Sequence, residues 1–394
     1  MFDTLKPQPA DKILALMDEF RADPREDKID LGVGVYRTPE GRTPVMRAVK
    51  AAEKRLWETQ ETKSYVATTG DPAFTDAMRQ LILAHVVDPA RIAAAAMPGG
   101  TGAVRQAAEL VRHAEPSATV WLSAPTWPNH PSILRYLGMP MREYRYFDAA
   151  TGTVDAEGMF EDLAQVRPGD AILVHGCCHN PTGANLTEAE WGRLADLCVE
   201  KGAVPFVDLA YQGFGDGLAE DAAGVRLLAG RVPEMMVAAS CSKNFGLYRD
   251  RAGALLVLCR TPDAAKVAQG TLGWLNRQNF SFPPDHGTRI VQTILADDGL
   301  RADWTAELEE IRTSMLSLRD QLAAELRQRT NSDRFDFIAA HRGMFSRLGA
   351  TPEQVQAMRR DHGVYAVGDS RINIAGLNAS TVPILAAAMV DAGM

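Results

Sequence analysis

Lys243 stands in a serine-rich turn, residues 240–246, directly after the apolar run 235–239. An amine at the end of a buried strand is poorly placed for a surface charge, but it could act as a nucleophile toward a carbonyl group. Asp208 follows a second apolar run, 203–207. Its carboxylate would lie where open α/β sheets bind ligands, at the carboxyl end of a parallel strand. Without a ligand, Asp208 would be a helix cap or a turn residue.

A glycine-rich turn at residues 99–102 opens a helical run over 103–111. Glycines let the backbone approach an anion closely, and a helix N-terminus offers free N–H groups and a positive dipole. A dinucleotide motif fits less well, because Arg105 stands where the third glycine of that motif belongs. A helix start without any ligand is the other alternative. The residues expected to hold a phosphate are Gly100, Thr101, Ser240, Ser242 and Arg251.

An amine, a carboxylate and an anion cradle are together what pyridoxal 5′-phosphate requires of a protein. The Lys243 amine would bond to its aldehyde, and would then act as general base and acid on the substrate Cα proton. The Asp208 carboxylate would keep the pyridine nitrogen protonated, which makes the ring an electron sink. The sequence therefore predicts this cofactor between Lys243 and Asp208.

The composition of the 394-residue chain argues against several other classes of protein. A formal net charge of −8 is unsuited to binding nucleic acid or anionic membranes. No apolar run approaches the roughly 20 residues that span a bilayer, and residues 1–12 lack the apolar core of a signal peptide. The five cysteines are odd in number and none has the spacing of zinc ligands. These features indicate a protein of the reducing cytoplasm.

The elements that must position these groups alternate between short apolar runs and helical stretches. Such alternation predicts an α/β fold with parallel strands joined by right-handed crossovers. One crossover helix is expected to begin at Thr187, which can form a capping box with Glu190, and to end at Gly202. The strands are expected at 120–123, 171–175, 203–207, 235–239 and 252–258.

A long helix connects two expected domains. Apolar residues from Trp304 to Leu326 keep a 3–4 spacing, which predicts one helix over about 300–329. A helix of about 30 residues is about 45 Å long, which is more than a single core needs. We therefore expect an N-terminal arm and part of a small domain in 1–44, a large cofactor-binding domain in 45–310, and the rest of the small domain in 311–394.

A family resemblance is carried by seven segments in order: residues 30–36, 98–102, 127–130, 175–183, 208–214, 240–246 and 371–376. Together they resemble the class I, fold-type I pyridoxal-phosphate aminotransferases, specifically the bacterial aromatic amino acid and aspartate group. The resemblance covers essentially the whole chain. It implies a large domain, in which helices sandwich a mostly parallel sheet, and a smaller α+β domain.

The resemblance also implies which residues hold the cofactor. Trp127 would stack on the ring, and His130 would support Asp208 from behind. Asn180 and Tyr211 would donate hydrogen bonds to the phenolic oxygen of the cofactor. Taken without the resemblance, Trp127 would be a core residue and Asn180 part of a turn.

Further residues are implied to bind the substrate. Arg371 matches the α-carboxylate clamp of the family, for which a planar bidentate donor is well suited. Gly34 would contact the substrate from the small-domain side, together with Trp127 and Asn180. His175 and His179 are four residues apart, but they straddle the junction of a strand and a loop, so no metal site is expected.

Two residues are implied to serve a neighbouring subunit in a homodimer. Tyr65 resembles the tyrosine that reaches the phosphate in the partner's site. Arg277 resembles the arginine that binds the side-chain carboxylate of aspartate or glutamate. Residues 1–13 resemble the arm that embraces the other subunit.

The sequence indicates the preferred amino acid less clearly than it indicates the cofactor. Ser64 and Phe282 make the rim of the pocket less polar than in aspartate-preferring members, whereas Val35 and Thr43 remain aspartate-like. In dual-specificity members Arg277 swings away from uncharged rings, which avoids burying an unpaired charge. We expect a ping-pong aminotransferase (EC 2.6.1 class) that uses aromatic amino acids or aspartate with 2-oxoglutarate and forms glutamate.

Other activities of the same fold remain as alternatives. A strict aspartate aminotransferase would share every residue of the site. A β-lyase or decarboxylase would also need Lys243, Asp208 and Arg371, but it has no use for Arg277. The sensor domain of a transcription regulator is disfavoured, because the resemblance begins near residue 1 and leaves no room for a DNA-binding module.

Overall fold

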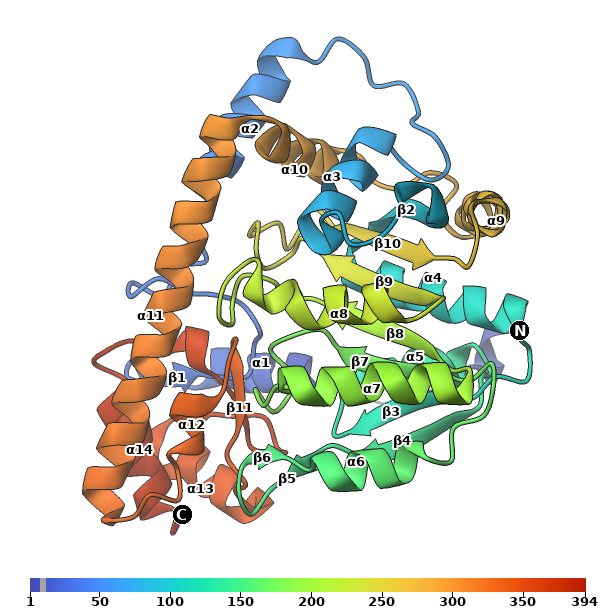
Figure 1. Cartoon of the computed structure of the whole chain (residues 1–394). Coiled ribbons are helices and arrows are strands. Elements are labelled where there is room, and N and C mark those ends of the chain that lie inside the picture. The colour runs from blue at the N-terminus through green and yellow to red at the C-terminus, as the bar shows by residue number, and fades with distance from the viewer. Residues whose placement is uncertain (8–11) are drawn as a thin grey trace.

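A seven-stranded sheet forms the centre of the molecule in the computed structural model, which describes residues 1–7 and 12–394 (Figure 1). Four neighbouring pairs of strands are parallel, so the expected mostly parallel α/β sheet is confirmed. The order is β2 (Ile92–Pro98), β10 (Ala252–Leu258), β9 (Met235–Ser240), β8 (Val204–Leu209), β7 (Ala171–His175), β3 (Val120–Ala124) and β4 (Met141–Arg145).

The sheet differs from the expectation in two ways that matter for the site. β10 is antiparallel to both of its neighbours, so the prediction of parallel pairing is wrong for this strand. β8 continues to Leu209, so Asp208 lies inside the strand and not after it. Asp208 is paired in register with His175 of β7 and Ala238 of β9, and its position is therefore set by two neighbouring strands.

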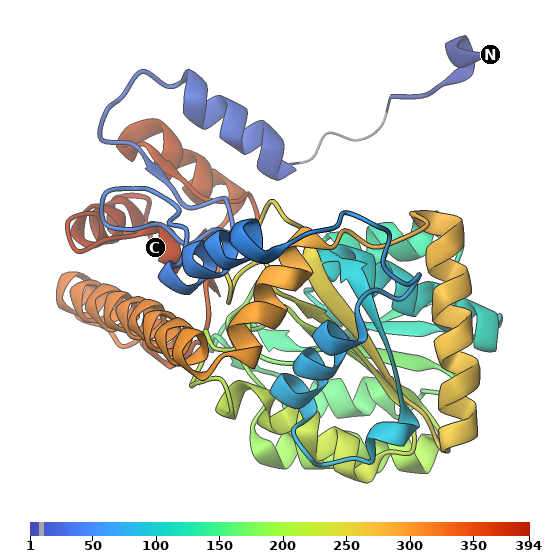
Figure 2. The same ribbon diagram turned by 90° about the horizontal axis from the view of Figure 1, so that it is seen from above.

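Helices cover both faces of this sheet (Figures 1 and 2). Successive residues of a strand point to opposite faces. In β7, Ile172 and Val174 join one apolar cluster, and Ala171 and Leu173 join the other. The cluster with Ala171 and Leu173, here the second, also contains residues of α4 (Gly99–Ala114), α5 (Asn129–Tyr136) and α9 (Pro262–Asn279). The first holds α2 (Arg47–Thr59), α3 (Pro72–Leu83), α6 (Ala156–Leu163), α7 (Glu188–Lys201), α8 (Ala223–Arg231) and α10 (His286–Ala296).

The predicted caps of α7 are confirmed. Thr187 accepts a hydrogen bond from the N–H of Glu190, whose carboxylate accepts one from the N–H of Thr187. Gly202 ends the helix with φ at 65°, a left-handed value that glycine adopts without strain. α4 begins earlier than expected, at Gly99, so the glycine-rich turn is itself the first turn of the helix.

The long helix α11 (Asp298–Thr330) agrees closely with the predicted range and runs along one side of the molecule (Figure 1). Its buried residues from Trp304 to Met315 belong to the apolar cluster of the large sheet. From Leu318 onward its buried apolar residues belong to a third cluster, formed with Ile29, Leu31 and the C-terminal residues. α11 thus crosses from one core to another, and the domain limits near residues 44 and 310 stay a prediction.

The third cluster lies among short elements from both ends of the chain. β1 (Ile29–Asp30) pairs in parallel with β12 (Val364–Tyr365), and β11 (Phe345–Arg347) pairs antiparallel with β13 (Arg371–Asn373). The helices here are α12 (Phe337–Ala340), α13 (Pro352–His362) and α14 (Val382–Asp391). The remaining elements are α1 (Lys12–Ala22), β5 (Phe147–Asp148), β6 (Thr153–Val154) and the 3-10 turns Phe2–Thr4, Pro89–Arg91, Glu220–Ala222 and Ile374–Gly376.

The N-terminus projects away from the body of the molecule in Figure 2, and residues 1–7 are all exposed. Part of the expected arm, residues 8–11, lies outside the described residues. Among the helices that are described, none combines the length and the apolar character needed to cross a bilayer.

Candidate active site

Lys243 follows the carboxyl end of β9, where the turn leaves the sheet, and its side chain is half-buried. Its Nζ lies 4.7 Å from the centre of the Tyr211 ring. Burial lowers the pKa of this amine to about 8, although the nearby Asp208 carboxylate acts in the opposite direction. A substantial fraction of the amine is therefore neutral at mildly alkaline pH, as a nucleophile and base must be.

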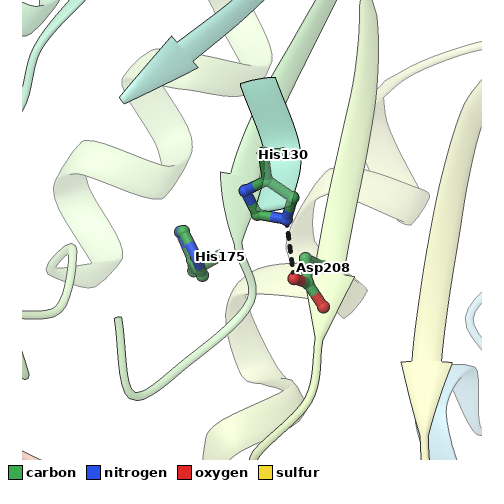
Figure 3. Close-up of side chains that lie close together, drawn as sticks. All are labelled: His130, His175 and Asp208. Atoms are coloured by element: carbon green, nitrogen blue, oxygen red, sulfur yellow. Dashed lines mark hydrogen bonds and ion pairs between the residues drawn. The ribbon is translucent and has the colours of Figure 1, made fainter. Parts of the chain in front are cut away.

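Asp208 is buried and is held from behind by a histidine (Figure 3). His130, at the start of α5, donates from Nε2 to Oδ2 of Asp208 over 2.9 Å, and its Nδ1 lies 2.8 Å from Oγ1 of Thr126. Burial is the largest influence on the Asp208 carboxyl and would raise its pKa, but the His130 hydrogen bond and the electrostatic influence of His130, His175 and Lys243 together leave the pKa below its ordinary value. The site thus keeps a carboxylate where a cationic ring nitrogen could meet it.

His175 lies beside this pair in Figure 3, with its ring centre 5.3 Å from that of His130. Neither of its ring nitrogens has a hydrogen-bond partner among the described residues. Burial lowers the pKa of His175 to about 3, so the ring is neutral. His175, His130 and Asp208 come near enough to share an ion. His130 and Asp208, however, direct their facing atoms at each other, and the expectation of no metal stays a prediction.

The N-terminus of α4 meets the turn after β9 in an anion cradle. Gly99 has φ at +71°, and a Cβ there would lie 2.5 Å from a guanidinium nitrogen of Arg251. A Cβ on Gly100 would lie 3.0 Å from the Ser240 side chain. Arg251 donates to Oγ of Ser242 over 3.2 Å. Only glycine permits this close approach, which brings backbone N–H groups, hydroxyls and a guanidinium together.

Arg371 is a buried guanidinium with no carboxylate partner among the described residues. It donates to the carbonyl of Gly32 over 2.7 Å and to Oδ1 of Asn180 over 3.3 Å, and its Nε is unpaired. The Phe345 ring centre lies 4.3 Å from its Cζ. Burial lowers the pKa of Arg371, which shows that the cation is costly to hold here. An incoming carboxylate would supply the missing counter-charge.

Gly34 lies against the same aromatic ring. A Cβ at this position would lie 2.8 Å from the edge of Phe345. Any larger residue would therefore displace the Phe345 ring. The short distance gives a structural reason for glycine at a position that the sequence alone did not explain.

A cavity of about 180 Å³ lies among these groups. The cradle, the amine and the carboxylate that the sequence predicted all border it, and Arg371 bonds to Asn180, which lines it. Tyr248 and Ala210 were missed by the sequence reasoning, although Tyr248 lies between Lys243 and Arg251 in the chain. The lining residues are Gly34, Gly100, Thr101, Trp127, His175, Asn180, Asp208, Ala210, Tyr211, Ser240, Ser242, Lys243, Tyr248 and Arg251.

Four predicted site residues do not line this cavity. His130 and Arg371 bond to the lining residues Asp208 and Asn180, whereas Tyr65 and Arg277 lie at the surface. Tyr65 is 86% exposed and stacks on Phe282, with ring centres 4.7 Å apart. Arg277, which is also exposed, donates to Ser281 and lies with its Cζ 5.5 Å from the Phe282 ring centre. Both residues are exposed in the same surface cluster, and their role in the site of another subunit stays a prediction.

The chain matches a family model described as aminotransferase class I and II over residues 26–389. It is 59% identical, over the full length of both chains, to an aromatic-amino-acid aminotransferase of Paracoccus denitrificans. It is 47% identical to a tyrosine aminotransferase of Rhizobium meliloti, over 96% of each chain, and 42% identical to an aspartate aminotransferase of Escherichia coli, over 99% of each.

Solved structures agree with these relatives. An aromatic amino acid aminotransferase with 3-indolebutyric acid superposes with a TM-score of 0.98 at 59% identity, covering both chains completely. The aromatic-amino-acid aminotransferase from Burkholderia pseudomallei, described as covalently bound to pyridoxal phosphate, gives a TM-score of 0.97 at 38% identity. That match covers 100% of this chain and 99% of the other.

Proposed function

The chain belongs to the class I and II aminotransferases, and from that premise we propose that it exchanges amino groups between aromatic amino acids or aspartate and 2-oxoglutarate. The enzyme is an aminotransferase that depends on pyridoxal 5′-phosphate. Bound in the site, this cofactor supplies an aldehyde that bonds amines and a protonated ring that withdraws electrons from the neighbouring carbon. The cavity fits it, because an anion cradle, an amine and a carboxylate border the same space.

The cofactor would be held by the residues that line the large-domain side of the cavity. The N-terminus of α4, with Ser240, Ser242 and Arg251, would bind the phosphate through N–H groups, hydroxyls and a guanidinium. Asp208 would keep the ring nitrogen protonated. Trp127 would cover one face of the ring, and the Asn180 and Tyr211 side chains would donate to its phenolic oxygen.

The observation that carries the proposal is the half-buried Lys243, which lines the same cavity as Asp208 and whose pKa is lowered by burial to about 8. A neutral amine here can accept the proton from the substrate Cα and return it to the neighbouring cofactor carbon. The Tyr211 ring, 4.7 Å away, limits where Nζ can move. In transamination, one residue moves the proton from the substrate Cα to the neighbouring cofactor carbon. In a β-lyase or a decarboxylase, the substrate instead loses a substituent.

The substrate carboxylate would bind Arg371 and Asn180, beside Gly34. The same clamp serves the amino acid and the oxo acid, so the two must occupy it in turn, which implies a ping-pong order. For aspartate and glutamate, we place the second carboxylate on Arg277 of a partner subunit in a homodimer, where Tyr65 also reaches the partner's phosphate. The five free and buried cysteines suit the reducing cytoplasm, where we place the enzyme.

Replacing the lysine tests the proposal most directly. Lys243→Ala should keep the cofactor through the cradle but lose turnover by several orders of magnitude, because no group remains to move the Cα proton. The measurement is single-turnover loss of the cofactor's visible absorption after adding phenylalanine or aspartate without any oxo acid. Lys266→Ala, an exposed lysine of α9, is the control and should behave as wild type.

Each outcome of that experiment is informative. Wild-type turnover in Lys243→Ala would overturn the assignment of the catalytic base. In the wild-type protein, comparable rates with both amino acids would support dual specificity. Rapid reaction with aspartate alone would favour the strict aspartate aminotransferase, an activity that one of the relatives carries at 42% identity.

A further inference from the structure

Arg319 of α11 is fully buried, although it is a cation and lies outside the cavity. In the described part of the chain no carboxylate forms an ion pair with it. Burial lowers the pKa of its guanidinium to about 9. A buried charge without a counter-ion usually costs several kcal/mol, and an apolar residue of similar size would often stabilise the fold more. Its presence therefore calls for an explanation other than the packing of α11.

Both terminal nitrogens of the guanidinium donate to one short segment of chain, residues 338–346, whereas its Nε has no partner among the described residues. Nη2 donates to the carbonyls of Gly343 and Phe345 over 2.8 and 2.7 Å. Nη1 donates to the carbonyl of Ile338 over 3.0 Å and to Oγ of Ser346 over 2.7 Å. Four oxygens thus converge on one planar group, and this geometry fixes the backbone of the segment against α11.

A chain of hydrogen bonds extends from Arg319 to the large domain. Because Ser346 Oγ accepts from Arg319, its hydroxyl can donate to Nδ1 of His341, 3.0 Å away. His341 then carries its proton on Nε2 and donates to the carbonyl of Gly152 over 2.7 Å. Burial lowers the pKa of His341 to about 4, which is consistent with a neutral ring. Residues 338–346 are therefore bonded to Arg319 on one side and to Gly152 on the other.

This segment carries one wall of the proposed substrate site. Phe345 stands beneath Arg371, and its strand β11 pairs with β13, which begins with Arg371. The neighbouring N–H of Arg342 donates to the carbonyl of Gly183, in the loop that carries Asn180. Arg371 is thus in contact with the segment that Arg319 holds, and the loop that carries Asn180 is bonded to the same segment.

We propose that Arg319 is a positioning residue that sets the carboxylate clamp, by fixing residues 343–346 so that Phe345 holds Arg371 toward Asn180. The inference rests on the proposed function, since it concerns the binding of a carboxylate substrate. Arg319 does not touch the cavity, so it acts through Phe345 and not on the reaction itself. A shift of about 1 Å in the clamp would lower the affinity for the substrate strongly and the affinity for the cofactor only slightly.

The test uses the cofactor-loaded enzyme and 3-indolebutyrate, a carboxylate without an amine that can bind but cannot react. In Arg319→Met the Kd for this ligand, measured by calorimetry, should rise by about tenfold or more. Cofactor content should stay within twofold of wild type, and KM for phenylalanine should rise more than kcat falls. Arg319→Lys, which retains some of the donors, should show a smaller rise. Arg327→Met, on the same helix but paired at the surface with Asp336, is the matched control.

A double-mutant cycle separates positioning from general destabilisation. If Arg319 acts through Phe345, then Arg319→Met and Phe345→Leu should weaken 3-indolebutyrate binding less together than the sum of their separate effects. Additive effects, or a lowered melting temperature with an unchanged Kd in both Arg319 variants, would overturn the inference. Absence of ligand binding in the wild-type enzyme would instead overturn the proposed carboxylate clamp, and so the two failures are distinguishable.

Discussion

The two ends of the active-site cavity are built differently. The end proposed for the cofactor rests on the carboxyl ends of long, buried strands, where Asp208 is paired on both sides and Lys243 follows the neighbouring strand. The end proposed for the substrate rests on strands of two or three residues and on loops from both ends of the chain. A seven-stranded sheet and two apolar clusters hold the first end. The second is packed by the third apolar cluster, and its short strands rely in addition on hydrogen bonds made by single buried arginines.

This difference suits a reaction in which one ligand stays and others exchange. The cofactor remains in place through each cycle, so a fixed frame of strands serves it well. In the proposed ping-pong order, the substrates would enter and leave the clamp at every half-reaction. Short strands with few ladder hydrogen bonds can adjust at lower energetic cost than a wide sheet.

The largest expected effect lies at the cofactor end. Asp208→Asn keeps the shape of the side chain but removes the charge that would hold the ring nitrogen protonated, so kcat should fall by about a thousandfold. The Kd for 3-indolebutyrate, measured on the same preparation, should stay close to wild type. If binding weakened as much as kcat fell, the two ends would not be separate in the way described.

A smaller and more selective effect is expected at the rim. Arg277→Ala should lower kcat/KM for aspartate by about a hundredfold, because the side-chain carboxylate of aspartate would lose its partner. For phenylalanine, kcat/KM should change by no more than about threefold. Steady-state kinetics with the two amino acids gives the comparison. Arg260→Ala removes an exposed arginine that pairs with Glu234 and should change neither value. Equal losses for both substrates with Arg277→Ala would contradict its assigned role.

The smallest effect concerns the pH at which the empty protein takes up its cofactor. Lys243 must be neutral to bond, and its pKa is lowered to about 8 by burial, so the neutral fraction rises with pH. The rate of covalent uptake should increase about tenfold between pH 7 and pH 9 and then level off. Stopped-flow absorbance measures this rate, with the Lys243→Ala protein as a control that binds without the covalent step. A rate that kept rising above pH 10 would indicate an ordinary, solvated lysine.

The cofactor end could be predicted from residue patterns because its signals are local. Lys243 and Asp208 each follow an apolar run, and the glycines at 99–102 stand at a helix start. The error at Asp208, which lies within β8, arose because its buried carboxylate interrupts the apolar pattern of the strand. The antiparallel β10 could not be recognised, since an apolar run carries no sign of direction.

The substrate end was reached only through the family resemblance. Arg371 bonds to the carbonyl of Gly32, 339 residues earlier, and no local pattern reveals such a pair. Arg319 was missed for a related reason. It follows Leu318 on a helix whose apolar spacing was identified correctly, and an arginine at that position is normally a surface residue.

The pairing of β1 with β12 has a consequence for synthesis of the chain on the ribosome. The N–H of Ile29 bonds to the carbonyl of Gly363, and Leu31 packs among C-terminal residues. At typical rates of elongation, the N-terminal segment would wait roughly twenty seconds to a minute for its partner strand to be made. The central sheet can assemble during that interval, because all of its strands lie before residue 260. We therefore expect the nascent protein to acquire its cofactor frame first and its substrate clamp only at the end of translation.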